Sequence, residues 1–432
     1  MNGRLRIAVI GGGIAGLGTA WLLSRCHDVT VYEAEDRPGG HSHTVEVDWH
    51  GRAIPVDTGF IVYNEANYPL LTRLFAWLRV PTETSDMSFA VSIDRGNLEY
   101  ASTGLAGLFA QAGNIARPRF IAMLADLFRF YREAPRILER PDDPRSLREF
   151  LAEGRYGEPF VRDHLLPMAA AIWSCPMATM LDFPAASFVR FCHNHGLLRI
   201  SGRPQWRTVS GGSREYVRRL IEPFAWRLRL SRRVTAIRRD ADGVEIADAG
   251  DGRERFDQVV VAVHGDQALP MLADPSPEER AALGAFRYEP NRTVLHSDPA
   301  LMPRRQRAWS SWNYLAESRE EDRGASVTYW MNRLQNLEPA PPLFVSLNPL
   351  REPDPRKVHG EWRYEHPIFD RAAIAAQGRL AALQGARRTW YCGSYCGFGF
   401  HEDALRSATD VAVALHAPPP WLEIDRFAAR TA

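Results

Sequence analysis

The first apolar run of the sequence is RIAVIGGGIAG at residues 6–16, where a strand-like stretch leads directly into glycines. A short run rich in β-branched residues, such as Arg6–Ile10, predicts a central parallel strand that is buried on both faces. Residues 17–26 carry the small and apolar side chains of a helix that packs on a sheet, and residues 28–32, DVTVY, predict a second strand. This strand–glycine–helix–strand unit predicts an α/β fold with a Rossmann-like domain.

Three glycines in this unit have the spacing GxGxxG, which is typical of dinucleotide-binding sites. Gly11 permits the tight turn, Gly13 lets the backbone approach a pyrophosphate, and Gly16 allows close packing of the helix on the strand. The unpaired N–H groups at the start of the helix favour phosphate. Glu33 ends the second predicted strand, where its carboxylate can accept hydrogen bonds from both ribose hydroxyls and disfavours a 2′-phosphate. The sequence therefore predicts a dinucleotide site.

The composition is that of a globular protein, with 432 residues of which 45% are hydrophobic and 24% charged. Because 53 Lys and Arg face 52 Asp and Glu, the chain lacks the basic field that nucleic-acid binding needs, and no nucleic-acid partner is expected. Five cysteines do not make a disulfide framework in so long a chain, and we find neither a signal-peptide pattern nor an apolar run of transmembrane length. These observations predict a cytoplasmic protein with reduced cysteines.

The sequence after Glu33 narrows the choice of dinucleotide. It continues with AEDRPGGH at residues 34–41 and, further on, with DTG at residues 57–59. This pattern resembles the superfamily of flavin amine oxidases, phytoene desaturases and protoporphyrinogen oxidases, in which an acid–x4–Gly-Gly stretch wraps the FAD diphosphate. The usual amine oxidase sequence has Arg after the paired glycines, whereas this chain has His41.

Two later segments resemble the same superfamily. A β-meander over residues 233–263 would offer the backbone of Val234 to the adenine. The segment YCGSYCGFGFHEDAL at residues 391–405 would end a strand and open a helix whose N-terminus faces the flavin pyrimidine. Many relatives carry an acid where this chain has Ser394. The resemblance thus implies bound FAD.

The resemblance also implies the domain organisation, a Rossmann-like FAD-binding domain with an inserted mixed α+β substrate domain. The FAD-binding domain would comprise residues 1–65, 205–270 and 380–416, the substrate domain residues 66–204 and 271–379, and a C-terminal tail residues 417–432. The first insert is expected to be helical and the second to mix short strands with turns. The residues implied in FAD binding are Gly11, Gly13, Ile14, Ala15, Gly16, Glu33, Ala34, Arg37, Gly39, Gly40, His41, Thr58, Gly59, Phe60, Val234, Gly393, Ser394, Gly399, Phe400, His401 and Ala404.

Two segments of the first insert each have two interpretations. Residues 117–140, RPRFIAMLADLFRFYREAPRILER, have apolar residues at helical spacing, which fits either a core-packed helix or an interfacial helix on anionic lipid. The second interpretation would make the protein peripheral on the inner membrane face. Residues 169–180, AAAIWSCPMATM, fit either ordinary core packing or the wall of an apolar cavity for a chain-like substrate.

Neither the histidine pair nor the C-terminal cysteines predict a metal site. His193 and His195 point apart on a helix, and no acid or cysteine pair accompanies them at ligand spacing. Cys392 and Cys396 are interpreted as small buried residues near the cofactor, with covalent flavin attachment at Cys396 as the alternative. We therefore expect no metal.

The closest resemblance is to bacterial FAD-dependent oxidoreductases associated with methyl-branched and furan-containing membrane fatty acids. It rests on IAVIGGGIAGL at residues 7–17, VDTGFIVYNEANYP at 56–69, PQWRTVSGGSREYV at 204–217, and the C-terminal segment 391–405. It implies a desaturase in which flavin takes a hydride from a methylated, monounsaturated acyl chain, esterified in phospholipid, while a base removes the neighbouring proton. Oxygen or another acceptor would then reoxidise the flavin.

Two other functions stay open, an amine oxidase for a hydrophobic amine and a non-catalytic flavoprotein that handles lipid. Flavin amine oxidases typically hold a lysine beside the flavin, but the only lysine here is Lys357, in a charged, Pro-rich stretch. This disfavours a conventional amine oxidase. The candidate catalytic residues, all with groups that can accept or orient a proton or substrate, are Tyr63, Asn64, His195, Tyr395 and His401.

Overall fold

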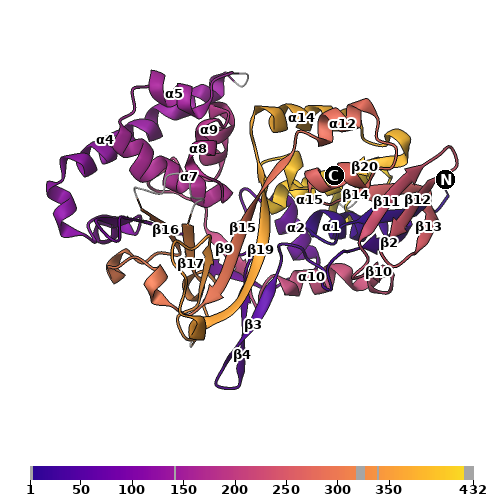
Figure 1. Cartoon of the computed structure of the whole chain (residues 1–432), viewed down its shortest axis with the longest axis horizontal. Helices are drawn as coiled ribbons and strands as arrows, with labels where there is room; N and C mark the ends of the chain where they lie inside the picture. Colours follow the sequence, from indigo (N-terminus) through magenta and orange to yellow (C-terminus); the bar gives the residue numbers. More distant parts are fainter. Residues whose placement is uncertain (1–2, 141–142, 318–325, 338–339, 423–432) are drawn as a thin grey trace, which may run out of the picture.

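The computed structural model of the chain describes residues 3–140, 143–317, 326–337 and 340–422. A five-stranded parallel sheet with helices on both sides forms one half of the molecule, on the right in Figure 1. A seven-stranded sheet stands in the middle, and a group of helices that includes α4, α5, α7, α8 and α9 covers the other end. Among the described residues, no helix is long and apolar enough to cross a membrane.

The parallel sheet has the strand order β10-β2-β1-β14-β20. Its strands are β1 (Arg6–Ile10), β2 (Asp28–Tyr32), β10 (Leu228–Arg229), β14 (Gln258–Val261) and β20 (Thr389–Tyr391). The first two strands have the predicted bounds, because their apolar runs are buried on both faces. This order confirms the predicted α/β fold with a Rossmann-like sheet, whose ligand site is expected where β1 and β14 end.

Different layers cover the two faces of the parallel sheet. Ile7 and Val9 pack with α1 (Ile14–Leu23), α10 (Arg214–Ile221) and α15 (His401–Ala414). The other face, with Ala8 and Ile10, packs against a meander and three helices. These elements are β11 (Val234–Arg239), β12 (Val244–Asp248), β13 (Arg253–Phe256), α11 (Gly265–Met271), α12 (Pro277–Leu283) and α14 (Arg371–Ala382).

A buried ion pair fastens the meander to α12. Arg239 Nη2 lies 3.0 Å from Glu279 Oε2, and both side chains are almost fully buried. Tyr391, at the end of β20, donates its hydroxyl to Glu279 Oε1 at 2.7 Å. Two charges and a phenol thus satisfy one another under the sheet, where an unpaired charge would be costly.

The seven-stranded sheet has the order β19-β15-β18-β17-β16-β7-β8 and is antiparallel except between β16 and β7. Its strands are β7 (Phe89–Ile93), β8 (Leu98–Ala101), β15 (Arg287–His296), β16 (Trp312–Ala316), β17 (Ser326–Trp330), β18 (Phe344–Leu347) and β19 (Val358–Ile368). The long β15–β19 pair runs through the middle of the molecule (Figure 1). Beyond its predicted helices, the first insert also contributes two strands to this sheet, β7 and β8.

Two small antiparallel sheets complete this part of the fold. The hairpin β3 (Thr44–Trp49) and β4 (Arg52–Asp57) projects from the molecule (Figure 1). The second small sheet contains β5 (Tyr63–Asn64), β6 (Thr82–Ser85) and β9 (Trp206–Val209). Because β9 pairs with both β5 and β6, it joins the end of the first cofactor segment, the start of the first insert and the residues that follow that insert.

Helices make up most of the first insert. They are α2 (Pro69–Trp77), α3 (Gly104–Leu108), η1 (Ala112–Ala116), α4 (Pro118–Glu133), η2 (Ala134–Glu139), α5 (Leu147–Glu153), α6 (Glu158–Phe160), the π-turn η3 (Val161–Leu165), α7 (Leu166–Trp173), α8 (Met177–Leu181) and α9 (Ala185–Asn194). The remaining short elements are η4 (Glu222–Arg227), η5 (Pro299–Leu301), η6 (Gln306–Ala308), α13 (Met331–Leu334), η7 (Pro355–Lys357), η8 (Ala386–Arg388) and η9 (Ser394–Cys396). The predicted helix over 117–140 changes from α to 3-10 geometry next to Pro135, which cannot donate a helical hydrogen bond.

Candidate active site

The glycine loop after β1 contains two kinds of glycine. Gly11 has φ +109°, and a Cβ atom there would lie 2.6 Å from the carbonyl oxygen of Ala262. A Cβ on Gly16 would lie 1.9 Å from the carbonyl oxygen of Gly11. Gly13 differs, because its backbone is extended and a Cβ there would meet no atom within 4 Å. Gly11 and Gly16 are thus required by the packing of the protein itself, whereas Gly13 borders open space of the kind a pyrophosphate needs.

A second glycine loop lies directly over the first. Gly39 donates its N–H to the carbonyl oxygen of Gly12 at 2.7 Å, and a Cβ on Gly40 would lie 3.2 Å from the Cα atom of Gly13. Arg37 closes this loop by donating from Nη1 to the carbonyl oxygen of Gly40 at 3.0 Å. The two loops therefore enclose the space beside Gly13 from two sides.

Glu33 lies at the carboxyl end of β2, at the edge of the same space. Its buried carboxylate accepts hydrogen bonds from the N–H groups of Gly12 at 2.6 Å and Glu35 at 2.8 Å. Arg232 donates its N–H to the carbonyl oxygen of Glu33 at 2.8 Å, which brings Val234 and the start of β11 to this edge. Ala34 is exposed beside them. This arrangement fits an adenosine, with an acid for the ribose and a backbone edge for the base.

The segment after β20 closes the opposite end of the space. Gly393 donates its N–H to Ser407 Oγ at 3.0 Å, and Gly399, with φ +97°, donates to the carbonyl oxygen of Ser394 at 3.1 Å. Asp403 Oδ2 accepts the N–H of Phe400 at 3.1 Å and caps the start of α15. The N-terminus of this helix carries the positive end of its dipole, which suits a flavin that becomes negative on reduction.

Neutral histidines lie beside these loops. The ring of His41 lies 6.0 Å from that of His264 and 5.4 Å from that of His366, and the ring of His401 stacks on Phe60 at 3.7 Å. Burial is the largest cause that lowers the pKa of His41, His366 and His401 to about 3. It likewise lowers the pKa of His264 to about 4. At neutral pH these rings therefore offer both a donor and an acceptor without adding positive charge.

The hydroxyl groups next to the histidines form two hydrogen-bonded groups. Thr58 Oγ1 lies 2.7 Å from the Tyr364 hydroxyl, which also lies 2.8 Å from His43 Nδ1. Ser42 Oγ contacts the Tyr216 hydroxyl and lies 3.0 Å from His401 Nε2. A Cβ on Gly59 would clash with the carbonyl oxygen of His41, so the DTG turn packs closely against the backbone of His41.

His195 occupies an aromatic environment at the end of α9. Its Nδ1 lies 2.9 Å from the carbonyl oxygen of Phe191, and its ring stacks on the Phe191 ring at 3.9 Å. The rings of Phe400, Trp206 and Tyr68 lie 6.0, 6.3 and 6.2 Å from it. Burial lowers the pKa of His195 to about 4. Because a carbonyl only accepts, Nδ1 carries the proton and Nε2 keeps a lone pair.

The predicted catalytic residues Tyr63 and Asn64 lie close to this histidine. Asn64 pairs with Trp206 between β5 and β9, and the ring of Tyr63 packs edge-on against Tyr68 at 6.3 Å. Asn64 Oδ1 accepts the N–H of Asn67 at 2.9 Å, whereas its buried Nδ2 has no partner among the described residues. Since His401 directly follows Phe400, the structure brings four of the five predicted catalytic residues into one region.

Tyr395, the fifth predicted catalytic residue, lies apart from this group. Its ring packs on Phe286 at 4.8 Å in the cluster on the meander side of the parallel sheet, whereas Tyr63 belongs to the cluster on the other side. Burial raises the pKa of Tyr395 well above 10, and its hydroxyl is buried without a partner in the described structure. Tyr395 therefore shapes the back of the 393–399 loop.

Cys392, at the start of this loop, is buried, and Cys396 is partly buried. Burial raises the pKa of Cys392 to about 12 and that of Cys396 further still, so neither is a thiolate at neutral pH. Cys392 Sγ lies 3.6 Å from Thr19 Oγ1. Within the described ranges, no group of three or more His, Cys, Asp or Glu residues is arranged to hold a metal ion.

The single lysine lies far from the candidate site. Lys357 Nζ forms an ion pair with Asp298 at 3.2 Å just before β19 begins. Tyr364 lies seven residues further along this extended segment, which corresponds to roughly 23 Å at the rise of a β-strand. No lysine side chain can therefore act beside the histidines.

Sequence reasoning missed several residues of the site, namely Ser42, His43, Tyr216, His264, Tyr364 and His366. His264 comes soon after β14, and the rule that ligands bind at the carboxyl ends of parallel strands would have found it. Tyr364 and His366 carry no such signal, because only the pairing of β19 with β15 brings them to the site.

Comparison with known proteins identifies the class. The sequence matches the family of flavin containing amine oxidoreductases over residues 14–299, more than half of its length, and the chain belongs to that family. It is therefore an FAD-dependent oxidoreductase, and the glycine loops, Glu33 and the start of α15 fit that cofactor. A comparison with curated protein sequences finds no match.

Solved structures share the fold at low sequence identity. A fatty acid isomerase from P. acnes that produces CLA has a TM-score of 0.67 and 17% identity, covering 95% of this chain and 98% of its own. Putrescine oxidase bound to putrescine has a TM-score of 0.69 and 15% identity, covering 96% and 99%. Cyclohexylamine oxidase from Brevibacterium oxydans has a TM-score of 0.68 and 16% identity, covering 95% and 98%.

Proposed function

We propose that this enzyme is a desaturase for an apolar acyl chain, namely a methylated, monounsaturated chain esterified in phospholipid, in the metabolism of methyl-branched or furan fatty acids. The observation that carries the proposal is the neutral His195 with a free Nε2 lone pair among four aromatic rings. Bound FAD supplies the acceptor for a hydride from the substrate. His195 Nε2 accepts the proton from the neighbouring carbon, and the remaining electron pair forms the new double bond.

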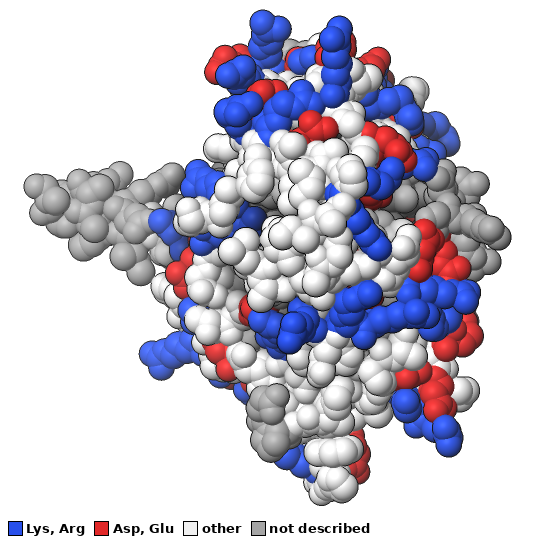
Figure 2. Space-filling view, turned by 90° about the vertical axis from the view of Figure 1, so that its left-hand side faces the viewer, with Lys and Arg blue, Asp and Glu red and all other residues white. Residues whose placement is uncertain are grey.

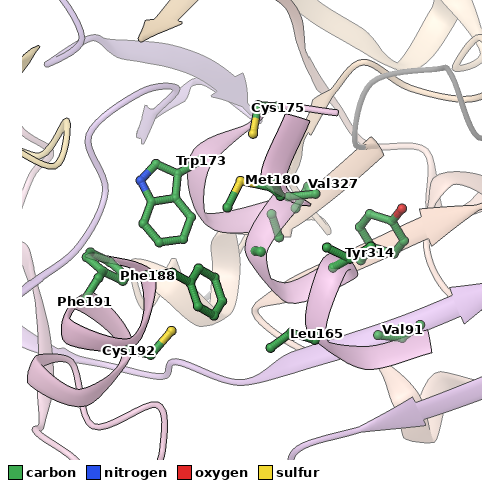
Figure 3. Close-up of a cluster of buried hydrophobic side chains, with 14 of the residues drawn as sticks. Val91, Leu165, Trp173, Cys175, Met180, Phe188, Phe191, Cys192, Tyr314 and Val327 are labelled. Carbon is green, nitrogen blue, oxygen red and sulfur yellow. The ribbon is translucent and has the colours of Figure 1, made fainter. Parts of the chain in front are cut away.

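The surroundings of His195 support an apolar substrate. Phe191 and Phe400 belong to a large hydrophobic cluster that continues through Trp173 and Phe188. Figure 3 shows Trp173, Phe188 and Phe191 facing one another, with the sulfur atoms of Cys192, Met180 and Cys175 around them. Trp173 also donates its indole N–H to the carbonyl oxygen of Phe398 at 3.3 Å, which ties α7 to the loop before α15. Such walls suit a hydrocarbon chain.

The charged groups near His195 do not favour an amine substrate. Glu402 accepts the backbone N–H groups of Leu70 at 2.9 Å and Leu71 at 3.1 Å, so its carboxylate serves the start of α2. Asp403 in turn caps α15. Both acids are thus engaged by backbone donors, and the lysine typical of flavin amine oxidases is absent from the site.

The test is reduction of the bound flavin under anaerobic conditions, which is monitored by the loss of the flavin's visible absorbance. Phospholipids with methyl-branched monounsaturated chains are compared with saturated phospholipids and with hydrophobic amines. We expect bleaching by the branched unsaturated lipid and a product that has lost two hydrogen atoms. Bleaching by amines alone, with release of an imine or aldehyde, would replace the proposal with an amine oxidase. No bleaching by any of these compounds would favour the lipid-handling flavoprotein.

A variant pair separates proton transfer from folding. His195→Gln removes the base, whereas His193→Gln changes a histidine two residues away on the same helix. We expect only the first variant to slow reduction by the acyl substrate, with FAD content equal in both. If the acyl substrate reduces the flavin of both variants as fast as that of the wild type, His195 is not the base.

A further inference from the structure

One end of the molecule exposes large apolar side chains. Leu105 on α3, Ile115 on η1, and Ile121 and Phe128 on α4 expose 75%, 67%, 46% and 51% of their surface. These four residues define what we call the apolar end surface. It belongs to the left-hand end of the molecule in Figure 1, where α4 lies, away from the parallel sheet. Soluble proteins rarely leave such side chains together in water.

The helix α4 is apolar on two of its faces. Phe120 and Met123 are buried in the core, as the core-packed interpretation of this segment expects. Ile121, Ala125 and Phe128 are exposed, and their spacing of four and three residues places them on one other face of the helix. Core packing therefore accounts for the first face, and the second face needs an apolar partner of its own.

Arginines border the apolar end surface. Residues 100–125 contain no Asp or Glu, and their only charged side chains are Arg117 and Arg119, of which Arg119 is paired with Glu158 and Asp163. The turn η6, which packs against α3, carries the exposed Arg307, and the exposed Arg304 lies just before this turn. Neither arginine forms an ion pair with a described residue. Figure 2 shows this side of the molecule, with uncharged atoms in the middle, Lys and Arg across and around them, and acidic side chains toward the edges.

We propose that the apolar end surface docks on a lipid bilayer that contains anionic phospholipid. Leu105, Ile115 and Ile121 would enter the region between headgroups and acyl chains, while Arg304 and Arg307 contact phosphates. A second copy of this chain fits the surface less well, because its arginines would meet arginines. The inference does not rest on the proposed function, since vesicle binding and flavin reduction are measured separately.

The experiment is flotation of the FAD-loaded, full-length enzyme with vesicles of phosphatidylcholine alone or mixed with phosphatidylglycerol. We expect the wild type to float with the mixed vesicles and much less with phosphatidylcholine. In the triple variant Leu105→Ser, Ile115→Ser, Ile121→Ser, the fraction of protein bound to the mixed vesicles should fall at least about fivefold, because three inserted side chains are removed. Trp226→Ser is the matched control, since Trp226 is 77% exposed but lies on η4 beside the parallel sheet.

Flavin absorbance of each variant verifies that it is folded. Arg304→Gln with Arg307→Gln should reduce the preference for anionic vesicles and leave the weak binding to phosphatidylcholine unchanged. The proposal is overturned if the wild type does not float, or if the triple variant floats as well as the wild type. It is also overturned if Trp226→Ser loses binding equally. A dimer that the triple variant abolishes, without vesicle binding, would assign the surface to self-association instead.

Discussion

The Nδ1 atom of His195 lies 2.9 Å from the carbonyl oxygen of Phe191, one turn earlier on α9. This contact fixes the proton on Nδ1 and leaves the lone pair on Nε2. The neighbouring rings keep the imidazole neutral, because burial lowers its pKa to about 4. A base that is uncharged at neutral pH and oriented by the helix itself needs no acidic partner.

The pH dependence of flavin reduction should therefore be that of a base with a low pKa. A histidine with a lowered pKa is unprotonated above that pKa, so the rate should stay constant through the neutral range and fall below about pH 5. The measurement is stopped-flow reduction by the acyl substrate at several pH values. His195→Gln should lower the rate by about 10²–10⁴-fold and remove the acid limb. A wild-type rate that rises between pH 6 and pH 8, in about the usual histidine range, would contradict this assignment.

The two kinds of glycine in the first loop predict variants with different effects, one on FAD affinity and the other on stability. Gly13→Ala should change the free energy of unfolding of the FAD-free protein by less than about 0.5 kcal/mol, because the added Cβ meets no protein atom. It should weaken FAD binding at least about tenfold, since the methyl group enters the space of the diphosphate. Gly16→Ala should destabilise the FAD-free protein by about 1–3 kcal/mol through overpacking. Equal FAD affinity of Gly13→Ala and the wild type would show that the cofactor lies elsewhere.

Glu33→Gln should weaken FAD binding without unfolding the protein. A hydrogen bond to a charged group contributes about 1.5–3 kcal/mol, so the dissociation constant should rise about ten- to a hundredfold. Titration of the FAD-free protein with FAD measures this directly. The control is Glu35→Gln, whose side chain is 65% exposed and should leave the affinity unchanged. An effect of similar size in both variants would point to general electrostatics rather than to a ribose contact.

The buried pair of Arg239 and Glu279 predicts a stability variant far from the chemistry. Glu279→Gln removes the buried carboxylate of the pair and leaves Arg239 with Asp274, whose side chain is partly exposed, as its acidic partner, so the free energy of unfolding should fall by about 1–3 kcal/mol. Glu278→Gln, an exposed neighbour on α12, should change it by less than about 0.5 kcal/mol. Urea unfolding of the FAD-free proteins is the measurement. Similar midpoints for the two variants would mean that the ion pair contributes nothing.

The nucleotide half of the fold could be predicted from sequence because its signals are local. The apolar runs of β1 and β2 are buried on both faces and end at glycines or at an acid, so their bounds follow from composition alone. The strand β19 could not be predicted in this way. Its residues, VHGEWRYEHPI, mix charged and aromatic side chains, and only its long pairing with β15 makes it a strand.

The candidate site likewise contains residues that motifs predict and residues that only the tertiary structure brings together. The glycine loops, Glu33 and the start of α15 follow from motifs, but the grouping of His41 with His264 and His366 depends on tertiary structure. For Tyr395, the motif predicts the position of the segment but not the direction of the ring. Its segment resembles a flavin-facing motif as a whole, yet the chain turns at Gly393 and sends this one ring to the other face of the sheet. A motif thus locates a segment, and backbone geometry decides where each side chain points.

The position of Lys357 has a practical consequence. The chain has one side-chain amine, which is partly exposed and lies beside Asp298 at the end of β19 distant from the flavin site. Coupling agents that react with amines can thus modify only one side chain, well away from the candidate active site. A fluorophore or a solid support attached there leaves the histidine-lined space open, so that surface-tethered enzyme can be studied without blocking its chemistry.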